Sequence, residues 1–559
     1  MHTFFKRWFA SGEPWIWMNA AAVGISVAAV VGIIGLIGVK GFAHFWPNEV
    51  LTIEYQTERG GTGQVYAELV QTEALAVQQF LESGGDADLV SANQEALERW
   101  LVKTGNRKHN PPDFRWVIES QISDTTIASG IVVLERIEWG NAYGIPTQLT
   151  LTESNEVIKE PTAVREKLAE RVERANELRE QIDKLEMGTL NHINYRLERL
   201  RLAQRKLTLE GVDESSQAQE IADEVAQLRQ DYAEDEQSLR KLYKSLNQDE
   251  LVLTLADGKQ LSVPVAEILS HWYPNDFSLL GRAGHFFSSI WRFLSDDPRE
   301  ANTEGGIFPA IFGTVLMVLL MSVLVTPFGV IAAVYLREYA TQGVFVRIIR
   351  IAVNNLAGVP SIVYGVFGLG FFVYFLGGNI DQLFYAEALP APTFGTPGLV
   401  WASLTLALLT VPVVIVSTEE GLTRIPRSLR EGSLALGATK SETLFKIILP
   451  MASPAILTGV ILAVARAAGE VAPLMLVGVV KLAPTLPLDG NFPYLHLDRK
   501  FMHLGFHIYD VGFQSPNVEA ARPLVYATAL LLITIIVALN LTAITLRGRL
   551  ERRYRGVES

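Results

Sequence analysis

Six long apolar segments constrain this chain more than any other feature of its sequence. They lie at about 18–40, 307–335, 349–377, 397–418, 455–480 and 522–546. A helix crosses a hydrocarbon core about 30 Å thick with roughly 20 apolar residues, and each segment is long enough. The sequence therefore predicts an all-α polytopic membrane protein with six transmembrane helices. The first segment is longer than the apolar part of a signal peptide, so we expect an uncleaved anchor.

The basic residues predict how these helices are oriented. They gather on one predicted side of the membrane, at Lys6, Arg7, 337–350, 419–446 and 547–559. The loop 378–397, on the other side, contains neither Lys nor Arg. Because cytoplasmic loops carry the excess of basic residues, we expect both termini and the basic tail 547–559 in the cytoplasm. The long segment 46–305 is then expected outside.

The composition of 46–305 differs from that of the flanking parts, 1–45 and 306–546, which hold the first span and the other five. It carries 45 acidic and 27 basic side chains, whereas the rest of the chain carries 15 and 21, and the net charge is −12. An acidic, polar domain therefore interrupts a basic, apolar protein. The absence of cysteine excludes disulfide scaffolds, thiolate metal sites and a cysteine nucleophile.

This insertion combines strand patterns with a helical pattern. Strand-like stretches form a predicted β module over 50–160 and 250–265, where Asp257-Gly258 is a hairpin signal. Between them, 161–248 predicts a helical hairpin whose second helix has Asp213 or Ser215 as its N-cap. Its apolar residues follow the 4-3 spacing of a coiled coil, at Val225, Leu228, Tyr232, Leu239, Leu242 and Leu246. The hairpin is either a passive spacer or a docking arm for an outside partner.

Another apolar pattern with helical spacing occupies 278–296, just before the second span. It comprises Phe286, Phe287, Ile290, Trp291 and Leu294. A helix with one such face suits the outer membrane surface, where that face is buried among lipids. A helix that packs against the core of the outer domain is the alternative.

The predicted cytoplasmic loop contains a compact helical element, EGSLALGATKSETLFKIILP, over 431–450. Gly437 permits a sharp turn between two short helices because it has no Cβ. Thr439 and Glu442 have the spacing of a capping box at the start of the second helix. Pro450 is expected to end that helix near the membrane. The element is a candidate docking surface.

The spacing in this loop resembles the EAA loop of bacterial ABC importer permeases, with a glutamate, a glycine six residues later and I-x-L-P. The matching positions, with the alanine after the glycine, are Glu431, Gly437, Ala438, Ile447, Leu449 and Pro450. Gly432 and Ser433 replace two alanines that are usual in the family. The resemblance implies the type I importer permease fold and a loop that docks on an ATPase subunit. The sequence contains no G-x-x-x-x-G-K-[ST] phosphate-binding loop, so we expect the ATPase to be a separate chain.

Two further stretches resemble the PstA permeases of phosphate-specific ABC transporters, NLAGVPSIVYGVFGLGFF at 355–372 and ARAAGEVAPL at 465–474. The A-P-L after the glutamate is similar to PstA rather than to the related PstC. The resemblance covers the first span and 300–559. It implies an inner-membrane phosphate importer with a PstC-like second permease, a PstB-like ATPase dimer and a PstS-like periplasmic phosphate-binding protein. ATP and Mg²⁺ would be bound by the ATPase, and this chain would need no cofactor and bind no nucleic acid. The role of the insertion is not implied.

Arg466 and Glu470 are the leading candidates for the substrate path. A charge at the centre of a membrane helix costs roughly 2.5–3.5 kcal/mol, and two of them at i and i+4 on one helix face indicate a function. A guanidinium binds two phosphate oxygens at once, and Glu470 would neutralise it when the site is empty. In the family the matching residues are regarded as important for transport. A structural ion pair is the alternative, and another oxyanion or a phosphonate would suit the same arginine.

The third predicted span supplies further polar candidates for the path. They are Asn354, Asn355, Ser361 and Tyr364. Polar residues in a membrane also serve helix packing. Pro360 is expected to break the helix there, which is tolerated where backbone groups line a cavity.

Two other classes of protein fit the sequence less well. A membrane scaffold or sensor would need a cytoplasmic output domain, and we expect only short loops and the tail there. An integral-membrane enzyme would show histidine or carboxylate clusters near one interface. His496, His503 and His507 lie in one predicted outer loop, but ordinary surface histidines are the simpler interpretation, and we expect no metal site. A permease that catalyses no chemistry and works by alternating access fits best.

Overall fold

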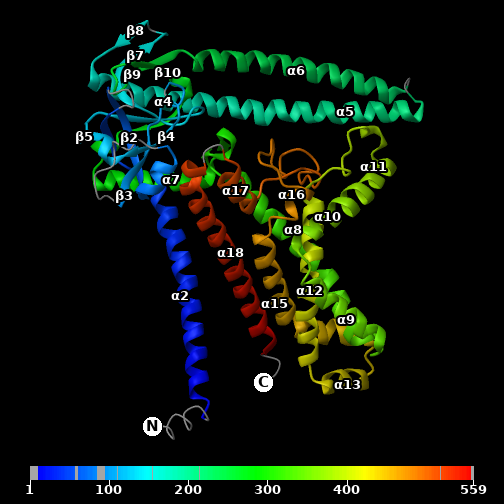
Figure 1. Ribbon diagram of the computed structural model, residues 1–559. Coiled ribbons are helices and arrows are strands. Elements are labelled where there is room, and N and C mark those ends of the chain that lie inside the picture. Colours follow the sequence, from blue (N-terminus) through cyan, green and yellow to red (C-terminus); the bar gives the residue numbers. More distant parts are fainter. Residues whose placement is uncertain are drawn as a thin grey trace, which may run out of the picture.

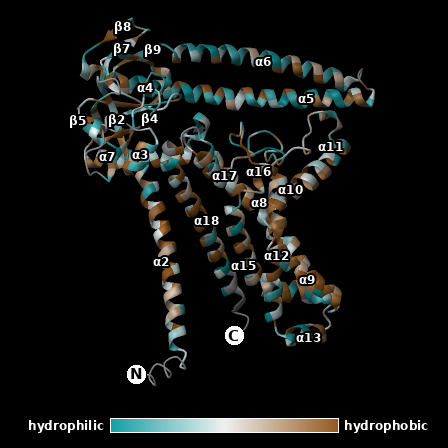
Figure 2. Ribbon diagram, in the orientation of Figure 1, coloured by the Kyte–Doolittle hydropathy of each residue, from teal (hydrophilic) through white to brown (hydrophobic). Residues whose placement is uncertain are grey.

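The computed structural model describes residues 11–56, 61–84, 95–109, 111–153, 155–212, 215–515 and 518–555. Lys6, Arg7, Asp213 and the last four residues of the basic tail lie outside these ranges. Figure 1 shows membrane-length helices with a β domain at one end, and a long helical hairpin that crosses over the same end. Figure 2 shows that these membrane-length helices are mainly hydrophobic, whereas the crossing hairpin is mixed with hydrophilic residues.

Among the described residues, six helices are long and apolar enough to cross a membrane. They span Glu13–Ala43, Phe308–Tyr339, Ser361–Phe384, Leu399–Arg424, Lys440–Gly469 and Ala521–Arg549. The predicted number of six is confirmed. Five of them build on α2 (Glu13–Ala43), α8 (Phe308–Val334), α12 (Leu399–Arg424), α15 (Leu449–Gly469) and α18 (Val518–Arg555). The sixth consists of α10 (Ser361–Phe367), a π-helical segment Gly368–Gly377 and α11 (Gly378–Phe384).

The third span lies later in the chain than the predicted 349–377. A separate amphipathic helix, α9 (Val344–Leu356), ends before Pro360, and α10 begins directly after it. Proline has no N–H and disfavours helical angles in the residue before it. The predicted break at Pro360 is therefore confirmed, and it separates α9 from the span instead of bending the span.

The fifth span is also shifted from the predicted 455–480. It begins at α14 (Lys440–Thr443), continues through a π-helical turn Leu444–Ile448 into α15, and ends at Gly469. Gly469 and the nearby Pro473 both disfavour further helix. The chain then leaves the helix, and only the short α16 (Leu474–Val477) follows. α17 (Leu504–Tyr509) precedes α18.

Two antiparallel sheets form the β domain. One has the order β4-β3-β2-β1-β5, and the other has the order β10-β9-β7-β6-β11, with β8 paired to β7. The strands are β1 Val50–Gln56, β2 Thr62–Ala76, β3 Ala96–Lys103, β4 Phe114–Ile118, β5 Ile122–Thr126, β6 Val132–Arg136, β7 Ala142–Leu151, β8 Glu156–Ile158, β9 Asp249–Thr254, β10 Gln260–Pro264 and β11 Ile268–Trp272. The β9–β10 hairpin confirms the Asp257-Gly258 signal, with Gln260 opposite Thr254. The predicted end of the module at 265 is too early, because β11 pairs with β6.

A helical arm, residues 161–246, leaves this domain. It consists of α4 (Pro161–Asp183), a π-helical segment Lys184–Leu190, α5 (Asn191–Glu210) and the returning α6 (Ser216–Leu246). Val164, Leu168, Val172, Ala175 and Ile182 of α4 are buried against the second sheet and anchor the base of the arm. The Ser215 side chain accepts a hydrogen bond from the Ala218 N–H, so Ser215 is the N-cap of α6.

The arm crosses over the permease helices and contacts the loop 481–500 that follows α16 (Figure 1). Nδ1 of His192 is 2.7 Å from Oδ1 of Asn491. The Tyr195 hydroxyl donates to the Phe492 carbonyl at 2.7 Å, and its ring contacts His496 edge-on. Two segments that are about 300 residues apart in the sequence therefore form a direct contact.

The helix α7 (Leu279–Ser295) connects the β domain to α8. Its N-cap is Ser278, and Arg292 makes an ion pair with Glu135 of β6. On its other face, Leu279, Leu280, Phe287 and Trp291 are largely exposed. One side of α7 is thus bound to the β domain, whereas the other presents apolar side chains.

The buried core of the membrane part lies between α8, α12 and α15. In the most apolar part of α12, 67% of the residues are buried, against 28% or less in the other spans. One buried hydrophobic cluster joins the three helices and contains Met317 and Met321 of α8, Leu406 of α12, and Ala463 and Ala467 of α15. α12 is therefore the central helix, and residues near its ends are held by the most closely packed part of the membrane domain.

Candidate functional site

Arg466 and Glu470 lie at the end of α15. Nε of Arg466 is 3.6 Å from Oε1 of Glu470. Glu470 has φ −81° and ψ 131°, so it follows the helix and does not share a helix face with Arg466 as predicted. The last turn of a helix favours a cation because the helix dipole is negative there. The two side chains are 33% and 21% exposed, so both remain accessible to a ligand.

Tyr364 connects this pair to the helix break. Its hydroxyl donates a 2.7 Å hydrogen bond to the carbonyl of Leu356, the last residue of α9. Its ring is buried in the cluster that contains Ala463 and Ala467 of α15. Tyr364 therefore links the end of α9 to the helix that carries Arg466.

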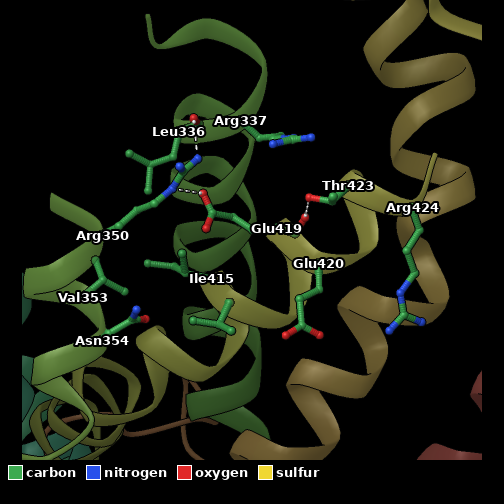
Figure 3. Close-up of a pocket in the computed structure, with 11 residues that line it drawn as sticks. Leu336, Arg337, Arg350, Val353, Asn354, Ile415, Glu419, Glu420, Thr423 and Arg424 are labelled. Carbon is green, nitrogen blue, oxygen red and sulfur yellow. Dashed lines mark hydrogen bonds and ion pairs between the residues drawn. The ribbon is translucent and has the colours of Figure 1, made fainter. Parts of the chain in front are cut away.

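The other three polar candidates occupy different positions. Asn354 and Asn355 lie exposed on the last turn of α9, and Ser361 begins α10. Asn354 lines a pocket of about 470 Å³ with Arg350 of α9 and Glu419 of α12 (Figure 3). The structure thus brings Asn354 together with Arg350 and Glu419, whose segments served in the sequence analysis only to predict the orientation of the helices in the membrane.

The loop predicted to couple to an ATPase begins with α13 (Arg427–Ala435). Gly437 follows it with φ 87°, a conformation that side chains with a Cβ rarely adopt, and Ala438 comes next. The capping box is confirmed: the Thr439 hydroxyl accepts from the Glu442 N–H, and Glu442 accepts from the Thr439 N–H. Glu431 is exposed on α13, where another chain could contact it.

Pro450 does not end the second helix of this loop, contrary to the prediction. α15 begins at Leu449 and continues through Pro450, after the wider π-helical turn that contains Ile447. A proline ring clashes with the carbonyl four residues earlier in a regular helix. The π-helical turn changes the spacing at that point, so the loop and the fifth span form one continuous element.

Arg430 links α13 to two other helices. Its Nη2 donates to Oε1 of Glu338 at 2.9 Å and to the Leu422 carbonyl of α12 at 2.8 Å. Glu338 lies in the π-helical turn Tyr335–Tyr339 that extends α8. A 2.8 Å hydrogen bond between Ser433 and Thr443 links α13 to the fifth span as well. The sequence did not predict this role of Arg430, because its partner Glu338 lies about 90 residues earlier in the chain.

The three histidines considered for a metal are buried and are not the surface histidines that were expected. His496 contacts Asp489 at 2.9 Å, and Nδ1 of His503 accepts from the Gly505 N–H at the start of α17. Burial lowers the pKa values of His503 and His507 to about 4. In the part of the chain that the structure describes, no three His, Cys, Asp or Glu side chains are placed to hold a metal ion.

Comparisons with known proteins cover the membrane part. The family model for the binding-protein-dependent transport system inner membrane component matches residues 325–556. The phosphate transport system permease protein PstA of Mycobacterium leprae is 36% identical over 254 residues, which is 45% of this chain and 74% of that protein. The chain belongs to the PstA family. PstA of Yersinia pestis is 33% identical over 256 residues, 46% of this chain and 77% of that protein.

Solved structures give weaker likenesses to this PstA-family chain. The MetNI methionine ABC transporter is 17% identical, covers 43% of this chain and 94% of its own, and has a TM-score of 0.32. A bacterial alginate ABC transporter is 14% identical, with 47% and 82% covered and a TM-score of 0.33. The PstA family assignment confirms the resemblance seen in the sequence. It makes this chain a non-enzymatic permease subunit and a multi-pass protein of the inner membrane.

Proposed function

We propose that this chain forms one half of the translocation path of an ATP-driven importer of inorganic phosphate. The similarity to PstA proteins over three quarters of their length carries this proposal. The partners would be a PstC-like second permease, a PstB-like ATPase dimer and a PstS-like phosphate-binding protein. Positive charges at the ends of α8, α9 and α12 support an orientation with α13 in the cytoplasm and the β domain and arm outside.

The Arg466–Glu470 pair supports phosphate as the substrate. Phosphate at neutral pH is a mixture of mono- and dianion, and a guanidinium can bind two of its oxygens. At 3.6 Å, Glu470 neutralises Arg466 when the site is empty. The pair is spread between a helix and the segment after it, so a change in that segment would separate the two charges. Arg466 would then be free to bind an anion.

Coupling to the ATPase is assigned to α13 and the turn at Gly437. Glu431 is exposed there, whereas Arg430 and Ser433 on the same helix bind α8, α12 and the fifth span. A push on α13 would therefore reach three helices through direct contacts. Because the proline at 450 does not interrupt the fifth span, motion of the loop would also reach Arg466 along one helix.

Phosphate uptake in cells that carry Arg466→Gln or Glu470→Gln tests the proposal, with co-purification of the ATPase as the check on assembly. Arg347→Gln on the exposed side of α9 is the matched control. We expect both site variants to assemble and lose uptake, and the control to retain it. Variants that assemble and transport normally would contradict the site. An unaltered chain that takes up a phosphonate or another oxyanion instead of phosphate would overturn the substrate.

A further inference from the structure

A pocket between α9 and α12 is a candidate binding site separate from the Arg466–Glu470 pair. Its volume is about 470 Å³, and Leu336 and Arg337 of the segment after α8 close one side. Its charged lining residues are Arg337, Arg350, Glu419, Glu420 and Arg424, and Asn354 and Thr423 are its uncharged polar ones. In Figure 3 the Arg350 guanidinium points at Glu419 and the Leu336 carbonyl. This α9–α12 pocket therefore combines a cavity with three guanidinium groups.

The charges in the pocket are only partly paired. Nε of Arg350 is 3.3 Å from Oε1 of Glu419, and its Nη1 donates to Gln342 at 3.0 Å. Among the described residues, no hydrogen bond or ion pair satisfies the side chain of Arg337, Glu420 or Arg424. Three positive and two negative groups leave one excess positive charge. An oxyanion would balance that charge and provide acceptors for the unpaired donors.

The geometry of the Arg350–Glu419 pair repeats that of the first pair. Arg466 and Glu470 are separated by 3.6 Å, and Arg350 and Glu419 by 3.3 Å. In both pairs the carboxylate is less exposed than the guanidinium, at 21% against 33% and at 19% against 34%. A long, partly exposed ion pair is weak, because water screens it. A ligand with two negative oxygens can compete with such a carboxylate.

The pocket is also connected to the first pair. Asn354 and Leu356 lie on the last turn of α9, and the Leu356 carbonyl accepts from the Tyr364 hydroxyl. Tyr364 belongs to the same buried cluster as Ala463 and Ala467 of α15, the helix that carries Arg466. An anion that leaves Arg466 would therefore meet the second guanidinium, Arg350, in the middle of α9.

We propose that the α9–α12 pocket is a second binding site for a phosphate group, in which Arg350 exchanges Glu419 for the ligand and Arg424 contributes a second charge. The proposal rests on the function proposed above, because it places the site at the cytoplasmic end of the path. The ligand is either inorganic phosphate that leaves the path or the phosphate of an anionic lipid headgroup. Glu419 keeps Arg350 neutralised when the pocket is empty.

Equilibrium binding of radiolabelled inorganic phosphate to the purified transporter tests this site. The assembled complex in neutral-lipid nanodiscs carries Arg466→Gln, so the first pair contributes little to binding. We expect Arg350→Gln and Arg424→Gln to weaken phosphate binding by about tenfold, as for loss of a charge-assisted hydrogen bond. Arg347→Gln, on the same helix but outside the pocket, should change nothing. The same series with Arg466 intact serves if the Arg466→Gln complex does not assemble.

Glu419→Gln separates a ligand site from a structural ion pair. If Glu419 competes with the ligand, its neutralisation strengthens phosphate binding, opposite in sign to Arg350→Gln. If the pair only holds α9 to α12, both variants act in the same direction, and the proposal is overturned. It is also overturned if the arginine variants match Arg347→Gln in every measurement.

Two sources of the phosphate group are distinguished by lipid analysis of the same preparations. Purification from native membranes, followed by mass spectrometry of bound lipids, shows whether Arg350→Gln and Arg424→Gln lose anionic lipid. Loss of lipid without loss of inorganic phosphate binding assigns the pocket to a headgroup. Binding does not depend on uptake, so a transporter that imports no phosphate would overturn the proposed function and leave this test of the pocket intact.

Discussion

Replacement of Arg430 by glutamine should uncouple ATP hydrolysis from transport. Its guanidinium donates to Glu338 at 2.9 Å and to the Leu422 carbonyl at 2.8 Å, and both charged side chains are only 18% exposed. Hydrogen bonds to charged groups contribute about 1.5–3 kcal/mol each. Loss of two at the lower value, about 3 kcal/mol, changes the equilibrium between attached and detached α13 roughly a hundredfold. The ATPase would then move a helix that no longer pulls on α8 and α12.

The assay measures phosphate transported per ATP hydrolysed in proteoliposomes that contain the complete transporter. We expect Arg430→Gln to keep the ATPase bound and active while this ratio falls at least about tenfold, the ratio that 1.4 kcal/mol represents. Arg427→Gln, on the exposed face of the same helix, is the control and should leave the ratio unchanged. Combining Arg430→Glu with Glu338→Arg restores an ion pair and should recover part of the coupling. An unchanged ratio in assembled Arg430→Gln would refute the reasoning.

Three further results are expected. Thr439→Ala removes the capping box. It should slightly lower the melting temperature of the complex and the affinity of this chain for the ATPase subunit, since an N-cap contributes about 1 kcal/mol. Because burial lowers the pKa values of His503 and His507 to about 4, the unfolded chain binds protons that the folded chain does not. Thermal stability should therefore fall as the pH decreases from about 6.5 to about 4, and less steeply in a His503→Gln, His507→Gln variant. His192→Ala with Tyr195→Phe should increase hydrogen exchange in the loop 481–500 if the arm restrains it, and exchange equal to the unaltered chain would exclude that restraint.

The lengths of the apolar segments, together with prolines and helix-capping residues, made the membrane part largely predictable. The number of spans, the break at Pro360, the capping box at Thr439 and the N-cap at Ser215 all followed from local chemistry. The third and fifth spans were misplaced because an apolar run does not show where a helix ends. Gly469 and Pro473 end α15 inside such a run, whereas Pro450 is tolerated within the helix because a π-helical turn precedes it. Pro327 and Pro412 likewise lie inside α8 and α12, so a proline by itself does not mark the end of a membrane helix.

Two strands of the β domain were not predictable from their own residues. β2 (Thr62–Ala76) and β3 (Ala96–Lys103) are rich in Ala, Glu, Gln and Leu, which favour helices. They become strands because they pair with each other and lie between β1 and β4. Tertiary pairing overrides propensity here. The Arg350–Glu419 and Arg430–Glu338 pairs were missed for a related reason, since about 70 and 90 residues separate their members and local patterns do not show which charges meet.

Other long-range contacts connect the insertion to the membrane part, through His192 and Tyr195 of the arm and the loop 481–500. The loop 481–500 beneath the arm is held by Asp489, which accepts from His496 and Arg499. Burial acts to raise the pKa of Asp489, but hydrogen bonds from the Asn491 N–H, Arg499 and His496 lower it to about 2, so the carboxylate stays charged. After this loop, the Phe501 carbonyl accepts from the N–H of Val480, ten residues after Glu470. If the arm restrains this loop, we expect a displacement of the arm at Tyr195 to reach the segment that follows Glu470. In that case an insertion outside the family match would act on the charge pair within it through the contacts at Tyr195 and Val480.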